Sequence, residues 1–139
     1  MAWLTQAHIE DRVQRDVLLS LADDDGDYSV DSRVIQSVAA DAEGVVESHI
    51  AGRYVVPLGT AEEALVDIAA AIAIHRLFFR RGEEAPDHVR EAHLLAMRRL
   101  HAIRRGEILL LEAIPRGRVA RSSMDAADRV FTRSTLRDL

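Results

Sequence analysis

The sequence predicts an all-α protein, a four- to five-helix bundle that carries an extended, partly ordered C-terminal tail. Apolar residues make up 48% of the 139 residues and charged residues 29%, which is the balance of one globular domain. Aromatic residues make up only 4%, so the core must consist mainly of Ala, Leu, Ile and Val. This composition, together with apolar positions that recur at helical spacing, favours closely packed helices over a β-sandwich.

Two short helices are expected near the N-terminus. Thr5 is a suitable N-cap for the first, because its hydroxyl can accept a hydrogen bond from an amide of the first turn. The second covers residues 16–22, where an aspartate precedes an apolar run. The acidic sequence of residues 23–27, which contains a glycine, should end this second helix.

A long helix is expected next. Asp31 is its predicted N-cap, and apolar residues keep helical periodicity over residues 34–50. Gly52 is expected to close the helix in a left-handed backbone conformation. Residues 54–59 should then form an extended linker, since Pro57 disfavours helix at the residue before it.

The following helix is apolar on nearly every side over residues 65–79. Thr60 is its predicted N-cap, and the Arg-Arg-Gly sequence of residues 80–82 is its predicted stop. A helix with so little polar surface must be buried on several sides, so it is either the central helix or the one that contacts a neighbouring subunit. The candidate residues for a subunit interface are Leu77, Phe78 and Phe79.

The last predicted helix begins at Pro86, where a missing amide donor costs nothing, and ends at Gly106. Its expected apolar stripe consists of Val89, Leu94, Met97, Leu100 and Ile103. Residues 108–111 are a short apolar run, for which a strand and a helical extension both remain open. These elements predict a helical domain over residues 1–114 and a basic tail over residues 115–139.

Charge is distributed unevenly around the net value of −5. Residues 1–64 hold 4 Arg and 13 acidic residues, whereas residues 115–139 hold 6 Arg and 3 acidic residues. An acidic head and a basic tail suggest head-to-tail contacts between copies, or a tail that binds an acidic partner. A solvated, disordered tail would have the same composition.

Several functional classes are not favoured. The chain has no cysteine, which excludes disulfides and thiolate chemistry. Residues 1–5 lack the features of a signal peptide, and the longest apolar stretch is interrupted by charges and too short to span a bilayer, so we expect a cytoplasmic protein without a membrane partner. Phosphate-binding glycine loops, nucleophile elbows and marked carboxylate pairs are missing from the sequence, so neither an enzyme nor a cofactor is expected.

The acidic sequence of residues 23–31 is the sharpest local motif. Interpreted as a calcium-binding loop, it supplies oxygen ligands at alternate positions, so that the chain can wrap around one ion. The candidate metal ligands are Asp23, Asp25, Asp27 and Asp31. Two positions depart from the pattern, because Tyr28 stands where a sharp turn calls for Gly and Val34 where a bidentate Glu is needed. The alternative is an acidic turn whose last member caps the next helix.

The histidines and the arginines suggest weaker alternatives. His93 and His101 share one helix face, while His49 and His75 lie on other helices and can meet only through the fold. Metal-binding motifs do not accompany them, so satisfied or surface histidines are the preferred interpretation. A nucleic-acid interface would use Arg98, Arg99, Arg104 and Arg105, but a solvated face paired with acidic neighbours fits their context better.

The order of five segments resembles that of a family of small Mu-like phage and prophage proteins encoded among virion morphogenesis genes. These segments read LSLADDDGDYSVD, GRYVVPL, AIHRLFFRR, RRLHAIRRGEI and DRVFTRSTL. The most specific correspondences are Gly52-Arg53-Tyr54, Pro57-Leu58, Arg80-Arg81 and Arg129-Val130-Phe131-Thr132-Arg133. Relatives often have Gly where this chain has Tyr28, which weakens the calcium interpretation.

The resemblance implies a fold similar to the helical head–tail connector, or head-completion, proteins of tailed phages. It implies a structural subunit that forms a ring beneath the portal and joins it to the tail, with itself and the portal and tail proteins as partners and only incidental DNA contact. The location would be the host bacterial cytoplasm during assembly, then the virion neck. In the tail, the candidate partner-binding residues are Arg129, Phe131 and Arg133. A small calcium-binding helical module and a nucleic-acid-binding regulator remain the alternatives.

Overall fold

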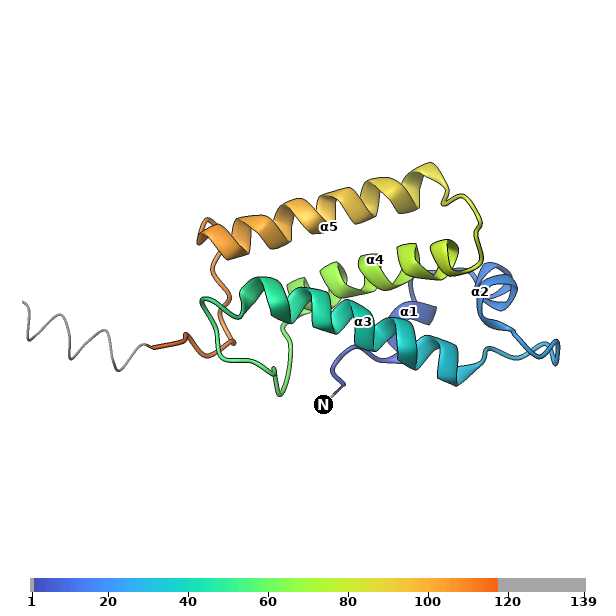
Figure 1. Cartoon of the computed structure of the whole chain (residues 1–139), viewed down its shortest axis with the longest axis horizontal. Coiled ribbons are helices and arrows are strands. Elements are labelled where there is room, and N and C mark those ends of the chain that lie inside the picture. Colours follow the sequence, from blue (N-terminus) through green and yellow to red (C-terminus); the bar gives the residue numbers. More distant parts are fainter. Residues whose placement is uncertain (1, 118–139) are drawn as a thin grey trace, which may run out of the picture.

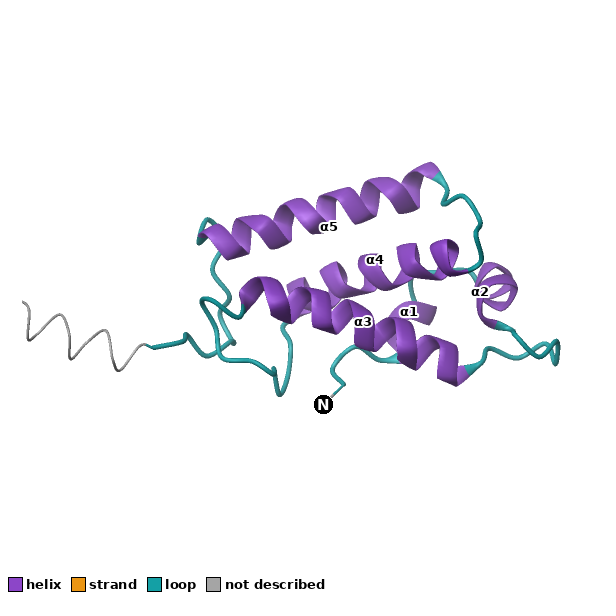
Figure 2. Ribbon diagram, viewed as in Figure 1, coloured by secondary structure: helices purple, strands orange, loops and turns teal. Residues whose placement is uncertain are grey.

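The computed structural model describes residues 2–117 and confirms the all-α fold. Three of the five helices in these residues are long, and Figure 1 shows them side by side with the short helices packed against them. In chain order the helices are α1 (Gln6–Glu10), α2 (Arg15–Ala22), α3 (Ser32–Ile50), α4 (Glu63–Arg80) and α5 (Asp87–Arg105). Figure 2 shows that loops connect them, and within residues 2–117 the only β-type pairing is one isolated bridge between Tyr54 and Pro115.

The N-terminal helices begin as predicted. The Thr5 hydroxyl accepts from the His8 amide, and the His8 Nδ1 accepts from the Thr5 amide at 3.1 Å, so α1 has a reciprocal capping box in which His replaces the usual Glu. Helix α2 begins at Arg15, one residue before the predicted start, and ends where the acidic loop begins.

Helix α3 starts as predicted but ends differently. The Asp31 carboxylate accepts from the Arg33 amide at 3.2 Å, which confirms the N-cap. The prediction for Gly52 is wrong, because the helix ends at Ile50 and Gly52 is not among the glycines with positive φ. The amides of Arg53 and Tyr54 both donate to the Ile50 carbonyl at 2.9 Å, so the chain leaves α3 through a right-handed turn. Such a turn does not need the left-handed conformation of a glycine cap.

The start of α4 also corrects the sequence prediction, since its N-cap is Glu62 and not Thr60. The amides of Leu65 and Val66 donate to the Glu62 carbonyl, so the first turn begins two residues later than expected. At the other end the predicted stop is confirmed. Gly82 has a φ of +69°, and the next amide donates back to the Phe78 carbonyl at 3.1 Å, which closes the helix in the manner of a Schellman motif.

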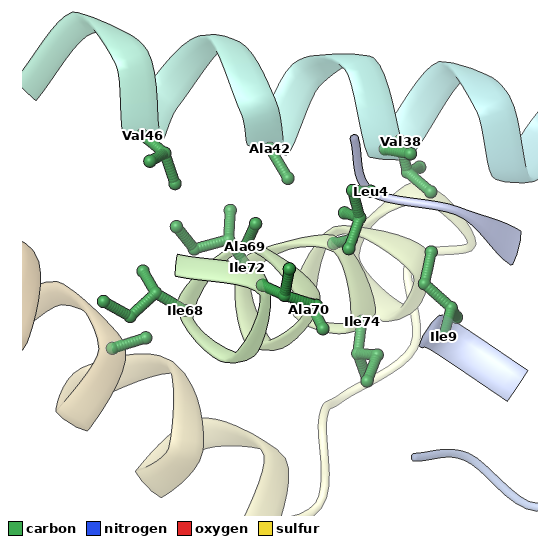
Figure 3. Close-up of a cluster of buried hydrophobic side chains, with 14 of the residues drawn as sticks. Leu4, Ile9, Val38, Ala42, Val46, Ile68, Ala69, Ala70, Ile72 and Ile74 are labelled. Carbon is green, nitrogen blue, oxygen red and sulfur yellow. The ribbon is translucent and has the colours of Figure 1, made fainter. Parts of the chain in front are cut away.

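Helix α4 is the central helix of the bundle, which is one of the two roles that the sequence predicted. It packs against α3 and α5 and is also contacted by α1 and α2. Figure 3 shows Ala42 and Val46 of α3 facing Ala69 and Ile72 of α4. Ten of its 18 residues are buried: Leu65, Val66, Ile68, Ala69, Ala70, Ile72, Ala73, Ile74, Leu77 and Phe78. Because three of them are alanines, the neighbouring helix backbones can approach α4 closely.

Helix α5 begins after Pro86 and ends at Gly106, whose φ is +83°, as predicted. Its apolar stripe is only partly as predicted, because the buried residues are Val89, Ala96, Leu100 and Ile103. Leu94 is 56% exposed, which makes its assignment to the core wrong. Five residues after Val89 correspond to a rotation of about 140° around the helix, so Leu94 lies well away from the buried face.

Residues 108–111 form neither a strand nor a helical extension. They belong to an irregular loop in which only Leu110 is buried. The chain then returns to the bundle, since the Arg116 amide donates to the Arg53 carbonyl at 2.8 Å. Backbone contact with the helical domain therefore extends two residues past the boundary at 114 that the sequence suggested.

We predict that replacing Ala69 with Leu destabilises the fold by about 1–3 kcal/mol, because the larger side chain must fit where α3 and α4 are in contact. Urea denaturation would measure the change in the free energy of unfolding. Ala40→Leu is the matched control on the exposed side of α3 and should change stability by less than about 0.5 kcal/mol. Equal effects of the two substitutions would contradict the close packing of α4.

Candidate functional site

The acidic loop after α2 brings together three of the four predicted metal ligands. Carboxylate oxygens of Asp23, Asp25 and Asp27 all lie within 4.8 Å of one another. Asp31 is not part of this group, because its side chain caps α3. The pKa of Asp25 is raised, chiefly by side-chain hydrogen bonds with Asp23 and then Asp27, because such a bond between carboxyl groups requires a shared proton.

The carboxylates of this loop already have backbone partners. Asp23 accepts from the amides of Gly26 at 2.9 Å and Tyr28 at 3.0 Å. Asp27 accepts from both the amide and the hydroxyl of Ser29, and these hydrogen bonds lower the pKa of Asp27. Tyr28 adopts the left-handed φ of +62° that the motif asks of a glycine at this position. The loop therefore closes on its own polar groups, and calcium binding stays a prediction.

Two arginines at the end of α4 fasten the acidic loop to the bundle. Arg80 and Arg81 both donate to the Leu21 carbonyl, at 3.2 and 3.3 Å, and Arg81 also donates to the Asp23 carbonyl at 2.9 Å. Both guanidinium groups pair with the Asp24 carboxylate, and the hydrogen bond from Arg80 is the main reason that the pKa of Asp24 is lowered. The Asp24 carboxylate thus pairs with arginines of α4, whereas the carboxylates of Asp23 and Asp27 accept from groups within the loop.

The histidines form two pairs that both include α5. The rings of His75 and His93 are stacked with centroids 4.1 Å apart, and those of His49 and His101 lie 5.3 Å apart. The sequence left open whether His49 and His75 meet, and the fold instead pairs each with a residue of α5. Burial lowers the pKa of His93, and the charges of His75 and Arg76 add to this effect.

The four arginines in the second half of α5 differ in exposure and in their contacts. Arg98, Arg104 and Arg105 are exposed and Arg99 is half-buried. Arg105 pairs with Glu107 at 3.1 Å, and this hydrogen bond is the main cause of the lowered pKa of Glu107. The carbonyls of residues 104 and 105 accept from the side chain of Arg53, at 2.7 and 3.0 Å, which fixes the end of the helix.

Side chains of the α3–α4 connection hold the loop that follows α5. The buried Tyr54 hydroxyl accepts from the Leu110 amide at 2.9 Å. The Glu62 carboxylate accepts from the amides of Leu111 and Glu112 at 3.4 and 3.2 Å. These contacts satisfy the backbone of a loop that has no regular secondary structure.

The same loop presents a patch of exposed apolar side chains, which we call the end patch. Leu111 is 90% exposed and Leu109 70% exposed, although neighbouring backbone groups are fixed by hydrogen bonds. The end patch consists of Val55, Ile108, Leu109, Leu111 and Ile114. Val55 and Ile114 are adjacent, since the amide of the first donates to the carbonyl of the second at 2.8 Å. Exposed apolar groups gathered in one place are typical of protein–protein contact surfaces.

A groove of 610 Å³ lies near the other end of α5, between the α1–α2 turn, α4 and the first turns of α5. Its apolar walls come from Val13, Val17, Ala71, Ile74, Phe78 and Val89. Its polar lining includes Arg12, which pairs with Asp67 at 2.5 Å and Glu63 at 3.4 Å, and His88. We call this feature the α4–α5 groove.

A family model described as Bacteriophage Mu, Gp36 matches residues 3–125. The chain belongs to this family. The match covers the whole helical domain, and it confirms the resemblance to Mu-like phage proteins drawn from the order of the sequence segments. No curated protein matches the chain significantly.

Membership in the Mu Gp36 family makes this a phage protein, and the structure shows what several residues of the resemblance do. Arg53 and Tyr54 hold the end of α5 and the loop after it, and Arg80 and Arg81 hold the acidic loop. Leu58 is buried in the core. These residues thus hold the end of α5 and two loops in position.

The predicted partner-binding residues divide into three groups. Arg129, Phe131 and Arg133 lie outside the described residues. Leu77 and Phe78 are buried in the chain's own core, with exposed fractions of 0% and 7%, and Phe78 also lines the α4–α5 groove, so their part in a subunit interface stays a prediction. Phe79 is 80% exposed and remains available to a partner. In the last turn of α4 the side chains of Leu77 and Phe78 are buried and that of Phe79 is exposed, because the core covers only one side of the helix there.

Sequence analysis missed the end patch and the α4–α5 groove. Three of the five end-patch residues lie in the apolar run of residues 108–111, for which the sequence left a strand and a helical extension open and gave no sign of exposure. Its hydrogen-bond partners, Tyr54 and Glu62, are about 50 residues away in sequence and carry no local motif. The groove combines residues of three separate elements, and only the fold brings these together.

We predict that Tyr54→Phe destabilises the Mu Gp36 family domain by about 1–3 kcal/mol, because the buried Leu110 amide loses its acceptor. Urea denaturation gives the free energy, and faster hydrogen exchange at the Leu110 amide would localise the effect. Tyr28→Phe removes a hydroxyl from a side chain that is 85% exposed and serves as the control. Unchanged exchange at Leu110 in Tyr54→Phe would contradict the role of the hydroxyl.

The lowered pKa of His93 predicts that stability falls as the solution becomes acidic. The unfolded chain takes up a proton near the ordinary pKa of 6.5, whereas the folded chain resists it, so protons favour unfolding below that pH. Stability should therefore decrease between about pH 7 and about pH 5, and His93→Gln should flatten this dependence. His88→Gln, at an exposed position, should leave it unchanged. Thermal unfolding followed across this range tests the prediction, and a flat wild-type profile would disprove it.

Proposed function

We propose that this phage protein is a structural subunit of the head–tail junction, a connector or head-completion protein, and not an enzyme. Its partners would be further copies of itself and the portal and tail proteins of the phage. Two findings support the proposal: membership in the Mu Gp36 family and a compact helical domain whose surface features are built for contact. None of the helices in residues 2–117 is both long and apolar enough to cross a membrane.

The end patch is the observation that carries the proposal. Tyr54 and Glu62 accept from backbone amides of the loop after α5, and the Arg53 carbonyl accepts from the Arg116 amide. The exposed leucines therefore do not depend on a flexible loop for their position. A preorganised apolar surface costs little conformational entropy when a partner covers it. Covering it would also remove side chains such as Leu111, 90% exposed in the isolated chain, from water. Both features suit a subunit that becomes part of a permanent assembly.

Two contact surfaces on one subunit favour a ring. The end patch follows the last turn of α5, whereas the α4–α5 groove lies beside its first turns. A subunit with different surfaces at its two ends makes heterologous contacts, and such contacts generate closed rings when the rotation between copies closes. A ring is the geometry that a junction beneath a portal requires.

We predict that deleting this gene from an inducible prophage yields filled or leaking heads separated from complete tails. Electron microscopy of induced particles provides the measurement. Supplying the wild-type gene in trans should restore virions, whereas Leu111→Glu should not, because a charge within the end patch opposes its burial in an interface.

Leu95→Glu is the matched control, since Leu95 is 55% exposed on α5 and lies outside the end patch. It should restore virions as well as the wild-type gene does. Normal virions after deletion would disprove the connector role. Restoration by Leu111→Glu would show instead that the end patch is not a contact surface.

A further inference from the structure

The α4–α5 groove is an apolar surface that the described part of the chain leaves uncovered. Its walls are formed by aliphatic side chains and Phe78, and its volume of 610 Å³ exceeds what one aromatic side chain needs. Arg12 lies at the groove and is already paired with Asp67 and Glu63. The groove thus offers a place for an apolar side chain.

The surroundings of the groove are strongly acidic. The segments that line or flank it, residues 10–17, 63–67 and 84–91, hold eight acidic residues and three arginines. Most of these side chains are well exposed; in the ion pairs at the groove, for example, 79% of Glu63 and 47% of Asp67 is accessible. An apolar groove with this surrounding charge should select a segment in which an apolar side chain lies between cations.

One segment of the chain has this pattern. Residues 118–139 contain five arginines and three acidic residues, and Phe131 is their only aromatic residue. Arg129 and Arg133 stand two positions before and after it. Phe131 supplies the apolar group, and the two arginines supply the cations that the acidic surroundings favour.

We propose that residues 129–133 of one copy bind in the α4–α5 groove of a second copy, with the Phe131 ring against the apolar walls. This inference rests on the proposed function, for which it supplies the link between neighbouring subunits. Arg116 is bound to the Arg53 carbonyl, at the end of α5, whereas Pro86 and Val89 line the groove at its start. The 19 residues of α5 separate these points by about 28 Å. The tail therefore leaves one end of the domain while the groove lies near the other, which is the arrangement of a head-to-tail contact.

Binding is tested by titrating a labelled peptide of residues 125–137 into the full-length Phe131→Ala protein, whose own tail no longer competes. We expect saturable binding that weakens as salt is added, because charges of opposite sign contribute to it. A peptide with Phe131 replaced by Ala should bind about 10-fold more weakly or worse, whereas replacing Leu136 should have little effect. Absence of binding at up to about 1 mM peptide would overturn the proposal.

The position of the site is tested by Ala92→Trp combined with Phe131→Ala. Ala92 lines the groove from the exposed side of α5, so a large side chain there fills the groove without entering the core. This protein should lose peptide binding and keep the circular dichroism of the folded domain. Ala40→Trp, at an exposed position of α3, is the matched control. Undiminished binding to the Ala92→Trp protein would place the site elsewhere and overturn the proposal.

Exchange between copies is tested with Phe131→Trp in the full chain. A blue shift of the added Trp emission that grows with protein concentration supports binding to a second copy. A shift that is independent of concentration would show the tail in its own groove, and no shift at any concentration would show it unbound; both overturn the proposal. The prophage deletion is an independent readout, because separated heads and tails without peptide binding would reject only this inference. Normal virions with peptide binding would reject only the connector role.

Discussion

Helix α4 lies at the centre of the bundle with ten of its 18 residues buried, and the other helices pack around it. Its buried residues include three alanines, Ala69, Ala70 and Ala73, whose side chains are short. The backbones of α3 and α5 can therefore approach α4 closely, and larger aliphatic side chains fill the remaining space. Because the scarcity of aromatic residues leaves few large side chains to fill gaps, the core depends on these short distances between helices. Within its length the helix makes ion pairs through Asp67 and Arg76. At its two ends, Glu62 and Arg80-Arg81 bind distant loops.

Polar residues therefore position loops in this protein. Tyr54 and Glu62 bind the loop after α5, and the side chain of Arg53 binds the last turn of that helix. Arg81 binds the acidic loop after α2. Most of these hydrogen bonds end on backbone groups, which irregular loops must satisfy in some way. Residues that carried the resemblance to the family, such as Arg53 and Arg81, make contacts of this kind. Their arrangement explains how a sequence pattern without any catalytic motif can still be specific to one family.

The fold was largely predictable because its signals are local. Caps at Thr5 and Asp31, the stops at Gly82 and Gly106, and the apolar surface of α4 all act within a few residues. Predictions failed where burial depends on a residue far away in the sequence, or on the direction in which a side chain leaves its helix. The predicted stripe from Leu94 to Ile103 uses steps of three residues, each shorter than one helical turn. These steps drift around the helix, so that Leu94 is exposed to solvent while Ile103 is buried. The end patch and the groove could not be predicted, since each depends on residues that only the tertiary structure brings together.

The buried apolar side chains of the described domain surround α4, whereas apolar side chains at its ends are exposed. Extending the core over the end patch would require further chain, and the loop of residues 107–116 is instead held open by hydrogen bonds. An exposed apolar surface of this kind promotes aggregation in a protein that remains a monomer. It is an advantage for a subunit whose neighbours have fixed positions, since contacts between unlike surfaces set an order in which copies can join. Under the proposed function, contacts with neighbouring subunits would cover the exposed apolar side chains that the core around α4 does not reach.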